Sequence, residues 1–99
     1  PPAVYYGALV NAPAGIAVGA TVDARVGESI CGSGVVSADQ DGNLRYTVKV
    51  EAADVGGNAG CGAPTRDVTF NVGGRDVPGT IKWDNNKLRK HDLEFPSGG

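Results

Sequence analysis

Hydrophobic and polar residues alternate along most of the chain, and this period of two is typical of β-strands whose two faces differ. The clearest case is residues 44–50, where every second side chain is apolar and those between are charged or carry a hydroxyl group. Residues 20–26 alternate in the same way, which predicts a strand with one face in the core and the other in water. Residues 4–10 are largely apolar on both faces, so we expect this strand to be central or well covered.

Turn-forming residues separate the strands. Asp41-Gly42 between two alternating segments is a strong hairpin signal, because glycine adopts a positive φ without steric strain. Gly73-Gly74 predicts a second tight hairpin, and Pro78 after it marks an edge strand or a bulge. The further strands expected are residues 29–31, 34–37, 68–72, 77–83 and 93–95.

This pattern predicts an all-β protein. About seven short strands are separated by turn signals roughly every 8–12 residues, and no window has a helical period. Such a pattern is typical of an antiparallel seven-stranded Greek-key sandwich. We expect residues 1–95 to form a single β-sandwich domain and residues 96–99, which are Pro, Ser and Gly, to form a linker.

The chain has two cysteines, Cys31 and Cys61, and each is followed by glycine. Structural zinc needs four ligands, so two cysteines and the single distant His91 are a poor set for it, and no C-x-x-C redox motif is present. A structural disulfide fits better and would join the glycine-rich loop at residues 52–66 to the strand region near Cys31. Because disulfides persist in oxidising compartments, we expect an extracellular or cell-surface location. The alternative is two unrelated buried thiols in a cytosolic protein.

Two parts of the first half resemble a known family. Residues 6–10 followed by 17–22 (YGALV and AVGATV), and residues 37–48 (SADQDGNLRYTV), are similar to carboxypeptidase regulatory-like and Cna-B-type domains of secreted bacterial or archaeal surface proteins. The resemblance spans about residues 4–50 and implies a prealbumin-like sandwich, with an immunoglobulin-like one as the alternative. Many Cna-B domains carry a Lys–Asn isopeptide bond, which is not expected here because residues 4–10 lack Lys and residues 93–95 lack Asn.

Charge excludes one class of partner. Nine basic and eleven acidic residues give a net charge of −2, so the basic footprint of a nucleic-acid-binding protein is missing. No apolar run approaches the roughly 18–20 residues that span a bilayer.

The basic cluster at residues 87–91 is flanked by acidic residues and predicts a solvated loop rather than a binding patch. His91 within it is expected to be solvated rather than catalytic, because no nucleophile motif accompanies it.

Aromatic and amide side chains are the candidate ligand-binding residues. Exposed aromatic rings stack on sugars, so Trp83, with Asn85 and Asn86 close behind it, is a candidate carbohydrate site. Trp83 shares its strand face with an isoleucine, however, which favours a core position with only its N–H directed outward. Tyr5 is the next candidate if its ring, rather than that of Tyr6, is exposed.

Asp39, Asp41 and Asn43 place oxygen atoms at alternate positions, as the start of a calcium loop does. An EF-hand loop needs Gly at its sixth position and Glu at its twelfth, and those positions hold Leu44 and Val50 here. A plain hairpin turn is therefore favoured over a weak calcium site, and no other metal or cofactor is expected.

No catalytic set or phosphate-binding motif is found, so we do not expect an enzyme. The main hypothesis is a non-catalytic extracellular accessory module, a structural or adhesive spacer or repeat domain that is monomeric within a larger chain. Its expected partners are polysaccharide or another surface protein. The alternative is a carbohydrate-binding module of an extracellular enzyme, and a third hypothesis is an inhibitor or protein-binding domain that uses the loop at residues 52–66.

Overall fold

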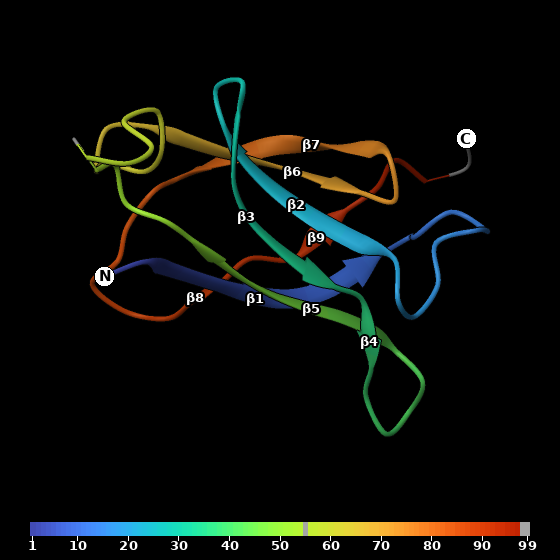
Figure 1. Ribbon diagram of the computed structural model, residues 1–99. Helices are drawn as coiled ribbons and strands as arrows, with labels where there is room; N and C mark the ends of the chain where they lie inside the picture. The colour runs from blue at the N-terminus through green and yellow to red at the C-terminus, as the bar shows by residue number, and fades with distance from the viewer. Residues whose placement is uncertain (55, 98–99) are drawn as a thin grey trace.

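The computed structural model describes residues 1–54 and 56–97, which form strands and loops and contain no helix. The strands in this part of the chain are β1 (Ala3–Val10), β2 (Thr21–Val26), β3 (Ser29–Val35), β4 (Ser37–Ala38), β5 (Leu44–Val50), β6 (Asp67–Val72), β7 (Arg75–Lys82), β8 (Arg89–Lys90) and β9 (Leu93–Glu94). They form two sheets that face each other (Figure 1). The predicted all-β class is confirmed. Of the linker predicted at residues 96–99, residues 98–99 lie outside the described part.

The two sheets differ in the direction of their strands. One has the order β4-β5-β1-β8, with β9 also paired to β1, and the other has the order β3-β2-β6-β7. Neighbouring strands are antiparallel except that β8 and β9 run parallel to β1. β1 is central in its sheet, as its two apolar faces predict. The hairpins predicted at Gly42 and Gly73-Gly74 are confirmed, and all three glycines have positive φ.

Two details differ from the predicted strands, and a third agrees with them. The two strands expected at residues 29–31 and 34–37 are one strand, β3, followed by the short β4. The basic cluster at residues 87–91 is not simply a solvated loop, because it contains β8, whose Arg89 and Lys90 pair with β1. Pro78 lies on the edge strand β7, next to a shift in the β6–β7 register, as predicted.

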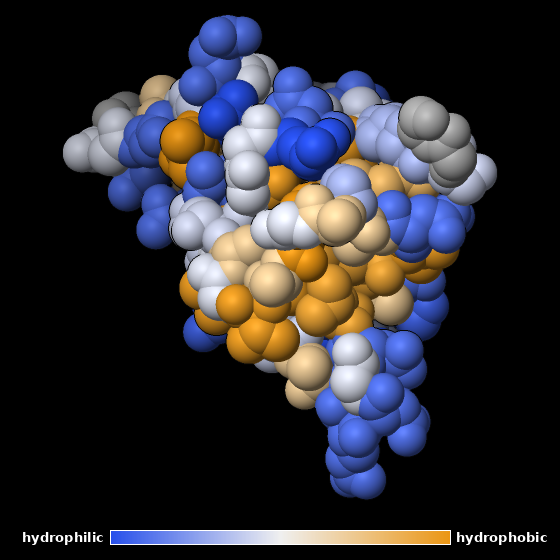
Figure 2. All heavy atoms as spheres, turned by 90° about the vertical axis from the view of Figure 1, so that its right-hand side faces the viewer, coloured by the Kyte–Doolittle hydropathy of each residue, from blue (hydrophilic) through white to orange (hydrophobic). Residues whose placement is uncertain are grey.

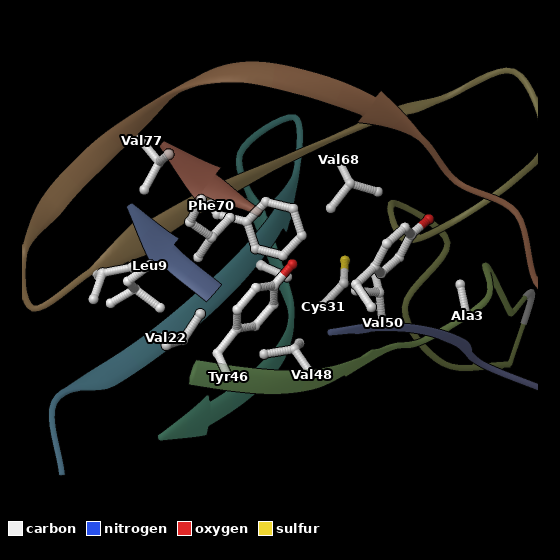
Figure 3. Close-up of a cluster of buried hydrophobic side chains, with 14 of the residues drawn as sticks. Ala3, Leu9, Val22, Cys31, Tyr46, Val48, Val50, Val68, Phe70 and Val77 are labelled. Atoms are coloured by element: carbon white, nitrogen blue, oxygen red, sulfur yellow. The ribbon is translucent and has the colours of Figure 1, made fainter. Parts of the chain in front are cut away.

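The inner faces of the two sheets enclose one hydrophobic core (Figure 3). At its centre Tyr5 and Tyr46 from one sheet meet the ring of Phe70 from the other in edge-to-face contacts, with ring centroids 5.9 and 5.7 Å apart. Small aliphatic side chains fill the space around them, and those that are fully buried include Val22, Val36, Val48, Val50, Val68, Val72 and Leu93. The alternation along β2, β5 and β6 therefore places their apolar residues as the sequence predicts.

Two glycines bring the sheets together along one side. β3 is an edge strand, but its backbone lies against β5 of the other sheet. A Cβ atom at Gly34 would be 2.5 Å from the carbonyl oxygen of Thr47, and one at Gly32 would clash with the carbonyl oxygen of Lys49. Only glycine permits so close a backbone approach, and it leaves β3 covered rather than free to pair with another chain.

Candidate functional site

The disulfide and the single tryptophan form one buried unit at the end of the sandwich. Cys31 and Cys61 are bonded, with their Cα atoms 5.6 Å apart, so the predicted disulfide is confirmed. Trp83 is 4% exposed and packs against Gly62, where any side chain would overlap the indole ring. Its Nε1–H donates a hydrogen bond to the carbonyl oxygen of Val50 at 3.0 Å. Trp83 is therefore a core residue that packs against Gly62 next to the disulfide, which leaves its ring unable to stack on a sugar.

Tyr5 is fully buried, so the exposure on which its candidacy as a sugar-stacking residue depended is absent. Its hydroxyl donates to the carbonyl oxygen of Lys82 and accepts a hydrogen bond from the N–H of Asp84, both at 3.1 Å. Burial raises the pKa of this hydroxyl, so it stays a neutral donor. The neighbouring Tyr6 is the exposed tyrosine of the pair, at 36%. Because both faces of β1 are apolar, the alternation could not tell which tyrosine points inward.

The predicted amide residues line a polar cavity of about 270 Å³. Its polar groups mostly bind other parts of the chain. Asn85 Nδ2 donates to the carbonyl oxygen of Pro1 at 2.9 Å, and Arg89 pairs with Asp84 Oδ2 at 2.7 Å. Asp84 Oδ1 accepts the N–H of Asn86 at 2.9 Å. The structure thus brings Trp83, Asn85 and Asn86 together. The Asn85 side chain fastens the start of the chain to the loop after β7, whereas Asn86 takes part in these bonds only through its backbone N–H.

The residues of the possible calcium loop form a hairpin turn between β4 and β5. Asp39 Oδ1 accepts hydrogen bonds from the N–H groups of Asp41 and Asn43, at 2.9 and 3.0 Å. These bonds, above all the one from Asn43, hold the pKa of Asp39 below its ordinary value, and Arg45 lowers it further. The Asp39 carboxylate is therefore engaged by the turn itself, as the hairpin interpretation predicts.

His91 is half-buried, which corrects the prediction that it is solvated. Its ring lies over that of Phe70, with the centroids 5.4 Å apart. Burial lowers the pKa of His91, although the charges of Asp92 and Glu94 act in the opposite direction. The imidazole is therefore held mainly in its neutral form, as part of the packing at the edge of the core.

The last part of the chain runs alongside the first in one continuous parallel register. Tyr5 pairs with Arg89, and Leu9 pairs with Leu93. The backbone N–H of His91 donates to the backbone carbonyl oxygen of Tyr6 at 2.8 Å, and the N–H of residue 95 donates to the carbonyl oxygen of residue 10 at 2.9 Å. We call this contact between β1 and residues 89–95 the terminal seam. The strand predicted at residues 93–95 is present as β9, but such short strands have no period that indicates a partner, so the pairing with β1 was not predicted.

A side chain completes the terminal seam where the backbone pairing is interrupted. The carbonyl group of His91 turns inward and accepts the hydroxyl of Tyr46, so it is not available to β1. Asp92 Oδ1 takes its place and accepts the N–H of Ala8 at 2.9 Å. That hydrogen bond, and then Lys90, keep the pKa of Asp92 below its ordinary value. Gly7 makes the crossing possible, because a Cβ there would be 2.7 Å from both the Asp92 carboxylate and the His91 carbonyl oxygen.

An apolar surface lies at the end of the molecule where β1 ends (Figure 2). Val18 and Val35, which are 61% and 59% exposed, belong to adjoining segments. Thr21 pairs with Val35, and the N–H of Gly19 donates to the carbonyl oxygen of Val36 at 2.8 Å. The long loop between β1 and β2 thus adds apolar side chains outside the core.

Within residues 1–54 and 56–97, no group of three or more His, Cys, Asp or Glu side chains is placed to hold a metal ion. The same residues include no helix with the length and apolar character needed to cross a membrane. Comparisons of the chain with protein-family models, curated proteins and solved structures found no match. The family resemblance of residues 4–50 therefore stays a prediction, and function is argued from the structure.

Proposed function

We propose that this chain is a non-catalytic structural module of a secreted or cell-surface protein, and that it carries tension along its length. The observation behind this proposal is the parallel pairing of the first and last strands. Because β1 and β9 run in the same direction, the chain enters the sandwich at one end and leaves it at the other (Figure 1). A spacer or repeat domain in a string of modules needs this placement.

The terminal seam suits such a load. Tension applied to the two ends pulls β1 and residues 89–95 in opposite directions along their own axes. The evenly spaced, slanted hydrogen bonds of a parallel pair link the two strands side by side, so this shear stretches them together rather than breaking them one after another. These bonds join His91 to Tyr6, Ala8 to Asp92, and residue 95 to residue 10.

The disulfide supports both the location and the mechanical role. Disulfides form and persist in oxidising environments, with which the Cys31–Cys61 bond is compatible. The bond also locks the chain between the two cysteines, which are 30 residues apart. At about 3.4 Å per extended residue, an unfolded oxidised module would therefore be roughly 100 Å shorter than a reduced one.

The proposal includes a prealbumin-like sandwich of the carboxypeptidase regulatory-like and Cna-B type. Two facing, mostly antiparallel sheets support it, together with the motifs of residues 4–50. In this assignment the disulfide replaces the isopeptide crosslink, for which the first strand has no Lys and residues 93–95 have no Asn.

Single-molecule pulling in two directions tests the proposal. In one arrangement the module is held through its two ends, which loads the terminal seam in shear. In the other it is held through azido side chains introduced at positions 67 and 82, which face each other across β6 and β7, so that the strands separate one pair at a time. The proposal predicts a clearly higher rupture force through the ends, and equal or lower forces would contradict it.

The alternative of a carbohydrate-binding module has no support at the site predicted for it, because Trp83 and Tyr5 are buried. Stacking of a sugar on either ring is therefore excluded.

A further inference from the structure

The outer face of the β3-β2-β6-β7 sheet holds a cavity of about 330 Å³ that the mechanical role does not use. Its polar lining comes from neighbouring strands, because Arg25 of β2 pairs with Thr69 of β6, and Asn71 of β6 pairs with Asp76 of β7. β7 departs from regular pairing beside Thr69, where Gly79 has a φ of 95° and also lines the cavity. The volume falls in the range of about 300–1,000 Å³ that is usual for small-ligand sites.

Arg25 lines this cavity, and its side chain carries an unsatisfied hydrogen-bond donor. Its Nε atom is buried and has no hydrogen-bond partner among the described residues. Buried N–H groups in native proteins are nearly always paired, so an orphaned one indicates an acceptor that the chain itself does not provide.

Asp76 lines the same cavity with the opposite charge, yet the two groups are not paired. Asp76 Oδ1 accepts a hydrogen bond from Asn71 Nδ2 at 2.9 Å, and Asn71 Oδ1 accepts the N–H of Gly74 at 3.0 Å. The turn after β6 thus fixes the direction of the carboxylate. Arg25 forms no ion pair with any carboxylate in the described ranges. The cavity lining therefore holds a guanidinium without an ion-pair partner and a carboxylate whose direction is fixed.

We propose that this cavity binds a neutral sugar through two adjacent hydroxyl groups. A hydroxyl group both donates and accepts, so one can accept a hydrogen bond from the guanidinium of Arg25 while its neighbour donates to the carboxylate of Asp76. A free anion would meet the charge of Asp76 and a free cation that of Arg25, so a neutral polyhydroxyl ligand fits the pair better than either. Thr69 places a further hydroxyl group in the lining.

The proposed contact is polar and therefore weak. The one aromatic residue in the lining, Phe70, is 3% exposed and offers no open ring for stacking. For a ligand the size of a single sugar ring we expect a Kd on the order of 1–10 mM. The site is independent of the load-bearing role, so either can fail without the other.

Nuclear magnetic resonance on the intact, oxidised chain tests the site directly, because the Nε–H of Arg25 gives its own signal. The methyl glycosides of glucose, galactose and mannose, with sodium acetate as the anionic probe, are each titrated. The proposal predicts a saturable shift of the Arg25 Nε–H signal and of the Thr69 and Gly79 amides with at least one glycoside, and none with acetate. The proposal would be overturned if only acetate gave a saturable shift, or if none of the probes did.

Two variants separate binding from folding. Asp76→Asn keeps an oxygen that can accept the Asn71 hydrogen bond but removes the charge, and it should raise the Kd at least about fivefold, since charged acceptors bind more strongly. Arg25→Gln removes the buried donor and should abolish saturable shifts of the Thr69 and Gly79 amides. Lys49→Gln, on the outer face of the other sheet, is the matched control and should bind as the natural chain does. If Arg25→Gln does not fold, Asp76→Asn decides, and unchanged binding by that variant would overturn the proposal.

Discussion

The Asp92 carboxylate and the backbone N–H of Ala8 are 84 residues apart in the sequence and 2.9 Å apart in space. Their hydrogen bond spans the point where β8 has ended and β9 has not begun. Without it, the pairing between the first and last strands would consist of two separate two-residue pieces. The side chain of Asp92 thus makes the terminal seam continuous.

Removal of the Asp92 carboxylate should destabilise the fold. In Asp92→Ala the N–H of Ala8 loses its acceptor, and we expect the free energy of unfolding to fall by about 1–3 kcal/mol. Asp92→Asn keeps an acceptor oxygen and should lose less. Urea denaturation followed by Trp83 emission measures both. Asp41→Ala, which removes an exposed carboxylate in the hairpin, is the control, and a loss no greater than the control's would contradict the role given to Asp92.

Gly7 should not tolerate a side chain. A methyl group there would be 2.7 Å from both Asp92 and the carbonyl oxygen of His91, so Gly7→Ala should destabilise the protein by about 1–3 kcal/mol through overpacking. Gly56→Ala is a matched control, because the nearest atom to its methyl group would be 3.8 Å away. Equal urea midpoints for the two variants would show that the backbone crossing is not so close.

Reduction of the disulfide should weaken the protein and expose its tryptophan. In the chain-entropy model, a loop of this length stabilises the fold by about 3–4 kcal/mol. Because Trp83 packs against Gly62, loosening of the loop should move its emission to longer wavelength. Emission and urea midpoint are compared with and without a reductant. The double variant Cys31→Ala with Cys61→Ala should have a lower urea midpoint than the oxidised chain, and the reductant should not change it. If the reductant shifted the midpoint of this variant as much as that of the natural chain, the disulfide would not be the cause.

Stability should decline in acid in two stages. The folded-state pKa of His91 lies below its ordinary value of 6.5, so the unfolded chain binds the proton more readily. Stability is therefore complete above pH 6.5 and falls as the pH drops below it. The folded-state pKa values of Asp39 and Asp92 lie below their ordinary value of 3.8, so the unfolded chain again binds protons more readily, and stability falls further as the pH drops below 3.8. In His91→Gln the urea midpoint should change less between pH 7.5 and pH 5 than it does in the natural chain. An equal change in both proteins would show that other groups cause the loss of stability in this pH range.

The sequence predicted those elements whose signal is local. The alternation in residues 44–50 gave β5 with its inward face, and Asp41-Gly42 gave the hairpin before it. The pairing of Cys31 with Cys61 followed from elimination of other roles, and strand parity favoured the buried position of Trp83.

The parts that the sequence did not reveal depend on contacts between distant segments. A last strand at residues 93–95 was predicted, but its pairing with β1, the strand β8 and the role of the Asp92 carboxylate have no local signal. Tyr5 and Tyr6 sit on two apolar faces, so only the packing of the second sheet determines which ring is buried. The cavity at Arg25 depends on the irregular pairing of β7 with β6, and Pro78 signalled that irregularity without indicating the cavity.

The most direct test of the load-bearing role is the rupture force of the oxidised module pulled through its two ends, measured for the natural chain, Asp92→Ala and Asp41→Ala. If the terminal seam carries the load, the natural chain and Asp41→Ala rupture at the same force and Asp92→Ala ruptures at a clearly lower one. If all three rupture at the same force, the seam does not carry the load, and the proposed function is wrong in its central point.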